Sequence, residues 1–146
     1  MQYIARIQWQ GNGQPFTAKT YDRTHSLTFG GGTAVQASSA PEFLGKAELV
    51  NPEELFTASL ASCFMLTFLY VAAMSQLSVE RYEAEAVGTL AKNEEGKMAM
   101  TEVVIKPNIT FTDGKAPDDA LLQSLYKKAH DTCFISCSVK TKVVIV

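Results

Sequence analysis

The longest segment without a charged side chain lies mostly within NPEELFTASLASCFMLTFLYVAAM, residues 51–74. Asn51 is a favoured helix N-cap, Pro52 suits the first helical position, and the two glutamates that follow complement the positive end of the helix dipole. From residue 55 to residue 79 there is no charged side chain, no glycine and no proline. These features predict a helix from residue 52 to about residue 76 that is buried on nearly all sides.

The apolar run of this helix has a second interpretation as a membrane span, which needs about 20 apolar residues. Hydroxyl side chains dilute the run, no Lys or Arg flanks it closely, and no other segment of the chain is similar. We therefore expect a buried helix and no membrane partner. Because a chain of 146 residues rarely surrounds so long a helix by itself, the helix also predicts a homodimer.

The segments on either side of this helix predict an α+β fold. Alternating apolar and polar residues favour strands, and turn residues separate them. The expected strands cover residues 3–10, 16–21, 25–29, 82–92, 98–111 and 139–146. A second helix is expected from the start signature APDD, residues 116–119, to about His130, and residues 30–50 are expected to be a loop.

Length and charge narrow the classes of function. With 146 residues the chain fits one domain, residues 1–146. The net charge is −2 and no basic run is longer than Lys127–Lys128, so we expect no nucleic-acid partner. The N-terminal stretch MQYIARIQWQ carries Arg6 where a signal peptide needs an apolar run. We therefore expect a cytoplasmic protein.

We expect no structural disulfide framework among the three cysteines, because such frameworks belong to oxidising compartments and we expect a cytoplasmic protein. Cys63 lies on the predicted central helix, while His130, Cys133 and Cys137 follow at i, i+3 and i+7 near the end of the second helix. If that helix runs on, these three side chains share a face and could form a Cys₃His zinc site with Cys63. Inert buried thiols and a redox pair are the other interpretations, and the residues alone leave all three open.

Two motifs carry a resemblance to a known family. The first motif is NPEELFTASLASCF at residues 51–64, and the second is AHDTCFISCSVKT at residues 129–141. Cys63 of the first motif and Cys133 of the second lie seventy residues apart. Both motifs are similar to those of the OsmC/Ohr family of osmotically inducible and organic hydroperoxide resistance proteins. Residues 21–35 look like an OsmC-like branch of that family. The resemblance implies an OsmC-like fold, in which antiparallel sheets wrap around a long buried central helix in an intertwined homodimer.

The resemblance also implies a function, the reduction of organic hydroperoxides to alcohols by an antioxidant stress-response thiol peroxidase. In the family the first cysteine attacks the peroxide and becomes a sulfenic acid, and the second resolves it as an intramolecular disulfide. Carried over, Cys63 is the peroxidatic thiol, Cys133 the resolving thiol, Glu53 a site carboxylate, and Arg23 the arginine that holds the thiolate. The resemblance implies no cofactor and no metal, and a dithiol reductant that is a lipoyl protein or thioredoxin-like.

Elementary chemistry agrees with these implied roles. A thiol buried in an apolar helix has a raised pKa, so Cys63 needs a nearby cation such as Arg23 to be a thiolate at neutral pH. Glu53 would pair with that guanidinium, yet ten helical residues separate Glu53 from Cys63 by about 15 Å along the helix axis. We therefore expect a site assembled across a dimer interface, where Glu53 and Arg23 of one chain meet the two cysteines of the other.

Several features leave alternatives open. Phe64, Phe68 and Phe134 either line a pocket for a hydrophobic peroxide or belong to the core. Cys137 departs from the family pattern, and it either competes as resolver, forms a disulfide with the resolving thiol, or is buried. His25 either belongs to the arginine's site or is a solvated loop residue. The alternative function is a non-catalytic OsmC-like binding or structural protein, with a Cys/His zinc site as a special case.

Overall fold

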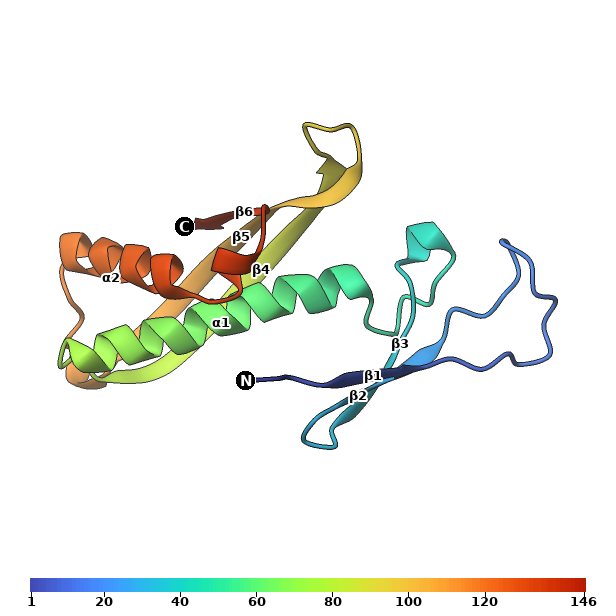
Figure 1. The fold of residues 1–146 in the computed structure, drawn as a ribbon. Coiled ribbons are helices and arrows are strands. Elements are labelled where there is room, and N and C mark those ends of the chain that lie inside the picture. The colour runs from blue at the N-terminus through green and yellow to red at the C-terminus, as the bar shows by residue number, and fades with distance from the viewer. The chain divides into compact units, whose positions relative to one another are not determined.

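The computed structural model describes the whole chain, residues 1–146. It contains two α-helices and six strands, and the strands form two three-stranded sheets (Figure 1). The predicted α+β class is therefore confirmed. The chain divides into two compact units, Met1–Leu55 and Phe56–Val146, and each is described by itself. The expectation of one domain over residues 1–146 stays a prediction.

The first unit is built on a small antiparallel sheet. Its strands are β1 (Ala5–Gln8), β2 (His25–Phe29) and β3 (Ala34–Ala37), and their order is β1-β2-β3. Ile7 of β1 lies opposite Leu27 of β2. The strand predicted over residues 25–29 is confirmed, and the one predicted over residues 3–10 is shorter than expected.

The strand predicted over residues 16–21 is wrong. This segment forms turns, in which the backbone N–H of Thr20 donates to the Thr17 carbonyl at 3.1 Å. Pro15 has no N–H to give to a sheet ladder. Three aromatic rings also hold the segment, with centroids 5.8 to 6.5 Å apart, namely those of Trp9, Phe16 and Tyr21. Side-chain packing therefore overrides the local preference for a strand.

The loop expected over residues 30–50 is partly ordered into short elements. It contains β3 and the 3₁₀ helix Pro41–Phe43, and Ala37 forms an isolated bridge with Val50. A side chain at Gly45 would collide with the Ser39 carbonyl oxygen, so only glycine fits this tight return of the chain. The elements are too short for a hydrophobic period to reveal them.

Helix α1 (Pro52–Met74) begins where the sequence predicts. The Asn51 Oδ1 accepts the Glu54 N–H at 2.9 Å, and a Glu54 carboxylate oxygen accepts the Asn51 N–H at 3.1 Å. This reciprocal pair is a capping box. The helix ends two residues before the predicted residue 76, because Gln76 adopts a left-handed conformation with a φ of 59°.

The second unit combines most of α1 with a long hairpin, a second helix and a final strand. Strands β4 (Val79–Lys92) and β5 (Met98–Phe111) are antiparallel, and β6 (Lys142–Ile145) pairs with β5 in parallel. Helix α2 (Asp119–Thr132) is capped by Asp118, whose carboxylate accepts the Leu121 N–H at 2.8 Å. The predicted hairpin, second helix and last strand are therefore confirmed, with β6 starting three residues later than expected.

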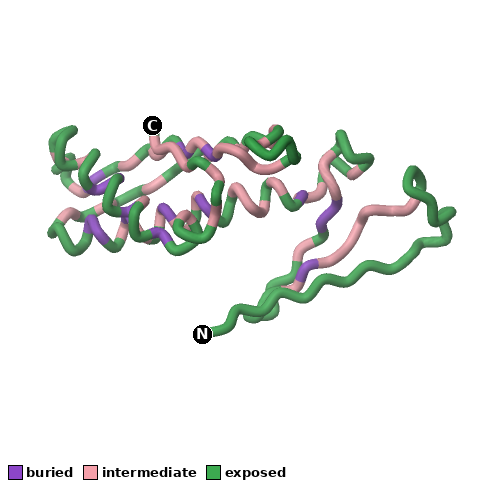
Figure 2. Tube along the Cα trace, turned by 45° about the horizontal axis from the view of Figure 1, so that its top comes forward, coloured by how far each residue is buried: buried purple, intermediate pink, exposed green.

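The core of the second unit lies between the two helices and the sheet (Figures 1 and 2). Its buried side chains come from α1, β5 and α2 and include Leu60, Phe64, Phe68, Val103, Ile105, Leu125, Tyr126 and Ala129. The Phe68 ring packs against the rings of Tyr82 and Tyr126, with centroids 6.1 and 5.4 Å away. Gly88 of β4 lets α1 approach the sheet, because a side chain there would overlap Thr57 Oγ1.

One face of α1 stays open within the chain. Leu66, Tyr70 and Met74, at i, i+4 and i+8, keep 61%, 66% and 67% of their surface exposed. Burial of this helix on nearly all sides, which we expect in a homodimer, stays a prediction, because the second unit of a single chain covers only one helix face. By length and composition alone α1 could cross a membrane, and 33% of its most apolar stretch is buried.

Candidate active site

Two of the three cysteines meet inside the second unit. Cys63 lies in the middle of α1, and Cys133 follows the last residue of α2. The Cys133 thiol lies close enough to Cys63 to raise the pKa of the Cys63 thiol, and both thiols are free. Cys133 is fully buried and Cys63 is partly buried. The structure thus brings together two thiols that lie seventy residues apart in the chain.

The turn after α2 gives each sulfur a backbone N–H donor. Cys133 leaves the helical conformation with a ψ of 115°, and the chain then turns through a 3₁₀ helix, Ser136–Ser138. The Ser136 N–H donates to Cys133 Sγ at 3.4 Å, and the Ile135 N–H donates to the Cys63 sulfur. Sequence reasoning missed both donors, because a main-chain group leaves no signature in the residue type.

The surroundings of Cys63 favour its neutral form. Burial raises the pKa of the Cys63 thiol above its ordinary value, and the neighbouring Cys133 thiol raises this pKa further. The Ile135 N–H and the Thr67 hydroxyl act in the opposite direction and lower the pKa. Since the net shift is upward, Cys63 needs an added positive charge to be a thiolate at neutral pH.

The two charged residues implied by the resemblance lie in the first unit. The Arg23 guanidinium donates to the Tyr21 carbonyl at 2.6 Å and to the Ala18 carbonyl at 2.8 Å, and it lies 4.1 Å from the centroid of the Tyr21 ring. His25 Nδ1 lies 2.8 Å from the Arg23 carbonyl oxygen. Glu53 lies in the first turn of α1. The roles of Arg23 and Glu53 stay predictions.

The structure does not assemble the Cys₃His zinc site. That site required α2 to run on through Cys137, but the helix ends at Thr132 and its cap residue Cys133 is extended. The exposed Cys137 thiol instead donates to the Asp131 carbonyl at 3.5 Å. No group of three or more His, Cys, Asp or Glu side chains in the chain is placed to hold a metal ion.

The three phenylalanines considered for a peroxide pocket separate into two kinds. Phe64 and Phe68 are fully buried in the core, with ring centroids 6.4 Å apart, so they fill space and line no open pocket within the chain. Phe134, in the turn beside the cysteines, is 83% exposed. Of the three, only Phe134 is available to contact a substrate.

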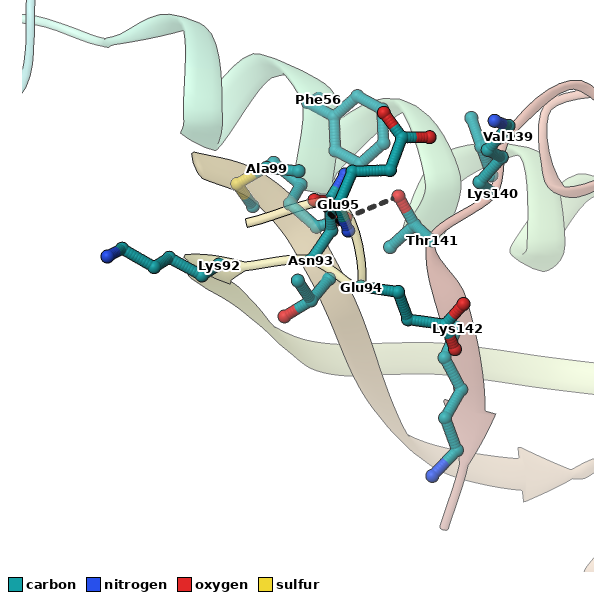
Figure 3. A pocket seen from close by; sticks show the side chains of 12 residues that line it. Phe56, Lys92, Asn93, Glu94, Glu95, Ala99, Val139, Lys140, Thr141 and Lys142 are labelled. Atoms are coloured by element: carbon teal, nitrogen blue, oxygen red, sulfur yellow. Dashed lines mark hydrogen bonds between the residues drawn. The ribbon is translucent and has the colours of Figure 1, made fainter. Parts of the chain in front are cut away.

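A separate cavity of about 790 Å³ lies at the turn between β4 and β5 (Figure 3). Its lining includes Phe56 of α1, lysines 92, 140 and 142, and the turn residues Glu94 and Glu95. The Thr141 hydroxyl donates to the Met100 carbonyl at 2.7 Å in its wall. No cysteine lines this cavity, and its charges are of both signs.

Solved structures of known proteins share the fold of this chain, and a protein-family model matches most of its sequence. The family model described as OsmC-like protein matches residues 45–146. An OsmC-like protein of unknown function from Vibrio cholerae is 38% identical, with a TM-score of 0.95 over 100% of this chain and 98% of that one. The organic hydroperoxide resistance protein OhrB of Bacillus subtilis is 22% identical, with a TM-score of 0.69 over 100% and 98%.

A further relative is the uncharacterized protein YmaD of Bacillus subtilis, which is 25% identical over 97% of this chain and 88% of its own length. Together with the family model and the two solved structures, it confirms the resemblance inferred from the two cysteine motifs. The predicted OsmC-like fold is confirmed by the same structures.

Proposed function

This chain belongs to the OsmC-like family, and we propose that it is a thiol-dependent peroxidase that reduces organic hydroperoxides to alcohols. The observation that carries the proposal is the proximity of the Cys63 and Cys133 thiols. A disulfide can form between two thiols in contact with little movement of the backbone. The similarity to organic hydroperoxide resistance proteins supports the class of substrate.

The proposed reaction has three steps. The Cys63 thiolate attacks the outer oxygen of the hydroperoxide, the O–O bond breaks, and the alcohol leaves with one proton while the sulfur becomes a sulfenic acid. The Cys133 thiol then attacks that sulfur, water leaves, and a Cys63–Cys133 disulfide forms. An external dithiol, a lipoyl protein or a thioredoxin-like protein, supplies two electrons and two protons that restore both thiols.

The backbone amides of the turn assist this chemistry. The Ile135 N–H stabilises negative charge on Cys63, and the Ser136 N–H stabilises negative charge on Cys133. These neutral donors do not overcome burial, because the pKa of Cys63 is still raised. Activation therefore needs a cation, and we assign this role to Arg23, held by Glu53 through a bidentate ion pair.

We further propose that the working unit is a homodimer in which Arg23 and Glu53 of one chain complete the cysteine site of the other. Hydroxyl side chains interrupt the apolar run of α1 and no Lys or Arg flanks it closely, which favours covering the open face of α1 by a second chain over covering it by lipid. Mixed dimers test the shared site. Cys63→Ser chains and Arg23→Ala chains, each inactive alone, should regain part of the activity when refolded together. A dimer that shows no regain would place each site within one chain.

The peroxidase itself is tested by the consumption of cumene hydroperoxide with dihydrolipoamide as reductant. Activity should be lost in Cys63→Ser and kept in the control Ser124→Ala, an exposed serine of α2. Cys133→Ser should allow one turnover and then accumulate an unresolved sulfenic acid, which dimedone would trap. Full activity in Cys63→Ser would contradict the proposal.

A second candidate function is a non-catalytic OsmC-like binding or structural role. The observation that favours it is the raised pKa of Cys63, which makes the thiol a weak nucleophile at neutral pH. In this case all three thiols would stay reduced after one equivalent of peroxide. Cytoplasmic localisation and a part in the stress response are proposals that rest on the peroxidase function.

A further inference from the structure

The third cysteine lies one turn beyond the buried thiol pair. The Cys137 N–H donates to the Cys133 carbonyl at 3.0 Å, an i to i+4 bond that closes a single turn. Cys137 is exposed, whereas Cys133 has no exposed surface. The Cys63 thiol is therefore partly buried, the Cys133 thiol is fully buried, and the Cys137 thiol is exposed.

This order of exposure hinders the last step of the proposed peroxidase, in which the external dithiol reduces the Cys63–Cys133 disulfide. A disulfide is reduced when a thiolate attacks one of its sulfurs, so access to that sulfur controls the rate. In a Cys63–Cys133 disulfide the Cys133 sulfur is enclosed, and the Cys63 sulfur lies in a partly buried position on α1. A protein-sized dithiol reaches neither sulfur as easily as it reaches Cys137.

We propose that Cys137 is a third catalytic thiol, which carries the disulfide from the buried pair to the protein surface, where the external dithiol reduces it. The inference rests on the proposed peroxidase function and adds a step to it. Cys137 is thereby the docking point of the reductant, and the exposed Phe134 beside it adds apolar contact surface for that partner.

The added step is balanced in atoms and electrons. The Cys137 thiol gives its proton to solvent, and its thiolate attacks Cys133 Sγ. The Cys63–Cys133 bond breaks, a Cys133–Cys137 disulfide forms, and Cys63 leaves as a thiolate ready for the next peroxide. The external dithiol then attacks the exposed Cys137 sulfur, becomes a disulfide itself, and leaves Cys133 and Cys137 as thiols.

The local geometry suits this exchange. The bond from the Cys137 N–H to the Cys133 carbonyl holds the two cysteines within one turn of chain, and a disulfide between them needs Cβ atoms about 3.5–4.5 Å apart. The 3₁₀ helix that carries Cys137 buries none of its residues, so a movement of Cys137 toward Cys133 breaks no core packing. The departing Cys63 sulfur is the one that accepts the Ile135 N–H, which stabilises it as a leaving thiolate.

The experiment follows the disulfides in time. The full-length protein is given one equivalent of cumene hydroperoxide without reductant, quenched with acid and N-ethylmaleimide at increasing times, and mapped by mass spectrometry. We expect the 63–133 disulfide first and the 133–137 disulfide later, with Cys63 alkylated in the later species. In Cys137→Ser the 63–133 disulfide should persist.

Turnover gives a second readout. Cys137→Ser keeps a donor for the Asp131 carbonyl, so the fold of the turn is retained. Its steady-state rate with dihydrolipoyl protein should fall about tenfold or more, while its first turnover of peroxide stays at the wild-type rate. The control Ser138→Ala changes an exposed neighbour in the same 3₁₀ helix and should leave both rates unchanged.

Two results would overturn the inference, and they differ from a failure of the proposed function. If the 63–133 disulfide forms and stays, with Cys137 alkylated at all times and Cys137→Ser turning over at the wild-type rate, the relay is wrong and the peroxidase stands. If peroxide leaves all three thiols free, the proposed function fails and the relay fails with it.

Discussion

Replacing Leu66 by glutamate should break the proposed dimer while leaving the chain folded. Leu66 lies on the open face of α1 and is 61% exposed, so the change adds no charge to the core of the single chain. In the proposed dimer the same position would be buried against the second chain. The two introduced carboxylates, one from each chain, would then lie without a partner in an apolar interface.

The size of the effect follows from the exposed surface. Fully burying an apolar side chain stabilises by about 1.5–3 kcal/mol, so Leu66, Tyr70 and Met74 each have about 1–2 kcal/mol left to gain. Counted once in each chain, the three side chains contribute about 6–12 kcal/mol to association. Leu66→Glu removes about 2–4 kcal/mol of this and adds the cost of two buried carboxylates, so the dissociation constant should rise at least about 100-fold.

Light scattering on a sizing column and sedimentation at several concentrations measure this change. The wild type should have twice the chain mass of 15.9 kDa, and Leu66→Glu should approach the mass of one chain with an unchanged circular dichroism spectrum. Leu121→Glu, the same substitution at a 42% exposed position of α2, is the control and should remain a dimer. A wild type of one chain mass, or a Leu66→Glu variant with the wild-type dissociation constant, would refute the reasoning.

Three further outcomes are expected. The pH midpoint of Cys63 alkylation by iodoacetamide should move upward in Arg23→Ala. Burial raises the pKa of Cys63, and in this variant the Arg23 cation no longer opposes that effect. An unchanged midpoint would show that Arg23 is not part of the site. Gly88→Ala should lower the free energy of unfolding by about 1–3 kcal/mol, because the added methyl group overlaps α1. The control Gly31→Ala has open space around it and should change the free energy of unfolding little. Urea titrations measure both variants. Tyr82→Phe should keep or raise stability at pH 7, because the Tyr82 hydroxyl is buried without a hydrogen-bond partner. Burial raises the pKa of Tyr82 to about 12, so the wild type should lose stability between its ordinary pKa of 10.0 and pH 12, and a parallel loss in Tyr82→Phe would contradict this.

The elements predicted well are those with strong local signals. Asn51 caps α1 as the N-P-E-E motif suggests, and Asp118 caps α2 as its own motif suggests. Both ends depend on residues within one turn of each other, so no tertiary information was needed. The segment over residues 16–21 failed for the opposite reason, because packing of its aromatic rings decides its conformation.

The candidate site was predictable only in part. The pairing of Cys63 with Cys133 came from the family motifs, since periodicity says nothing of a contact between residues seventy positions apart. The end of α2 at Thr132, which rules out the shared face needed for zinc, depends on one backbone torsion of Cys133. A torsion of this kind has no residue-type signature unless it requires glycine.

The N–H donors to the two sulfurs have a consequence for how this site tolerates substitution. Main-chain groups from Ile135 and Ser136 contact the thiols, so replacing either side chain by alanine leaves both contacts in place. Proline at either position would delete the donor outright. An alanine scan of the turn would therefore pass over a part of the site that a proline scan would find.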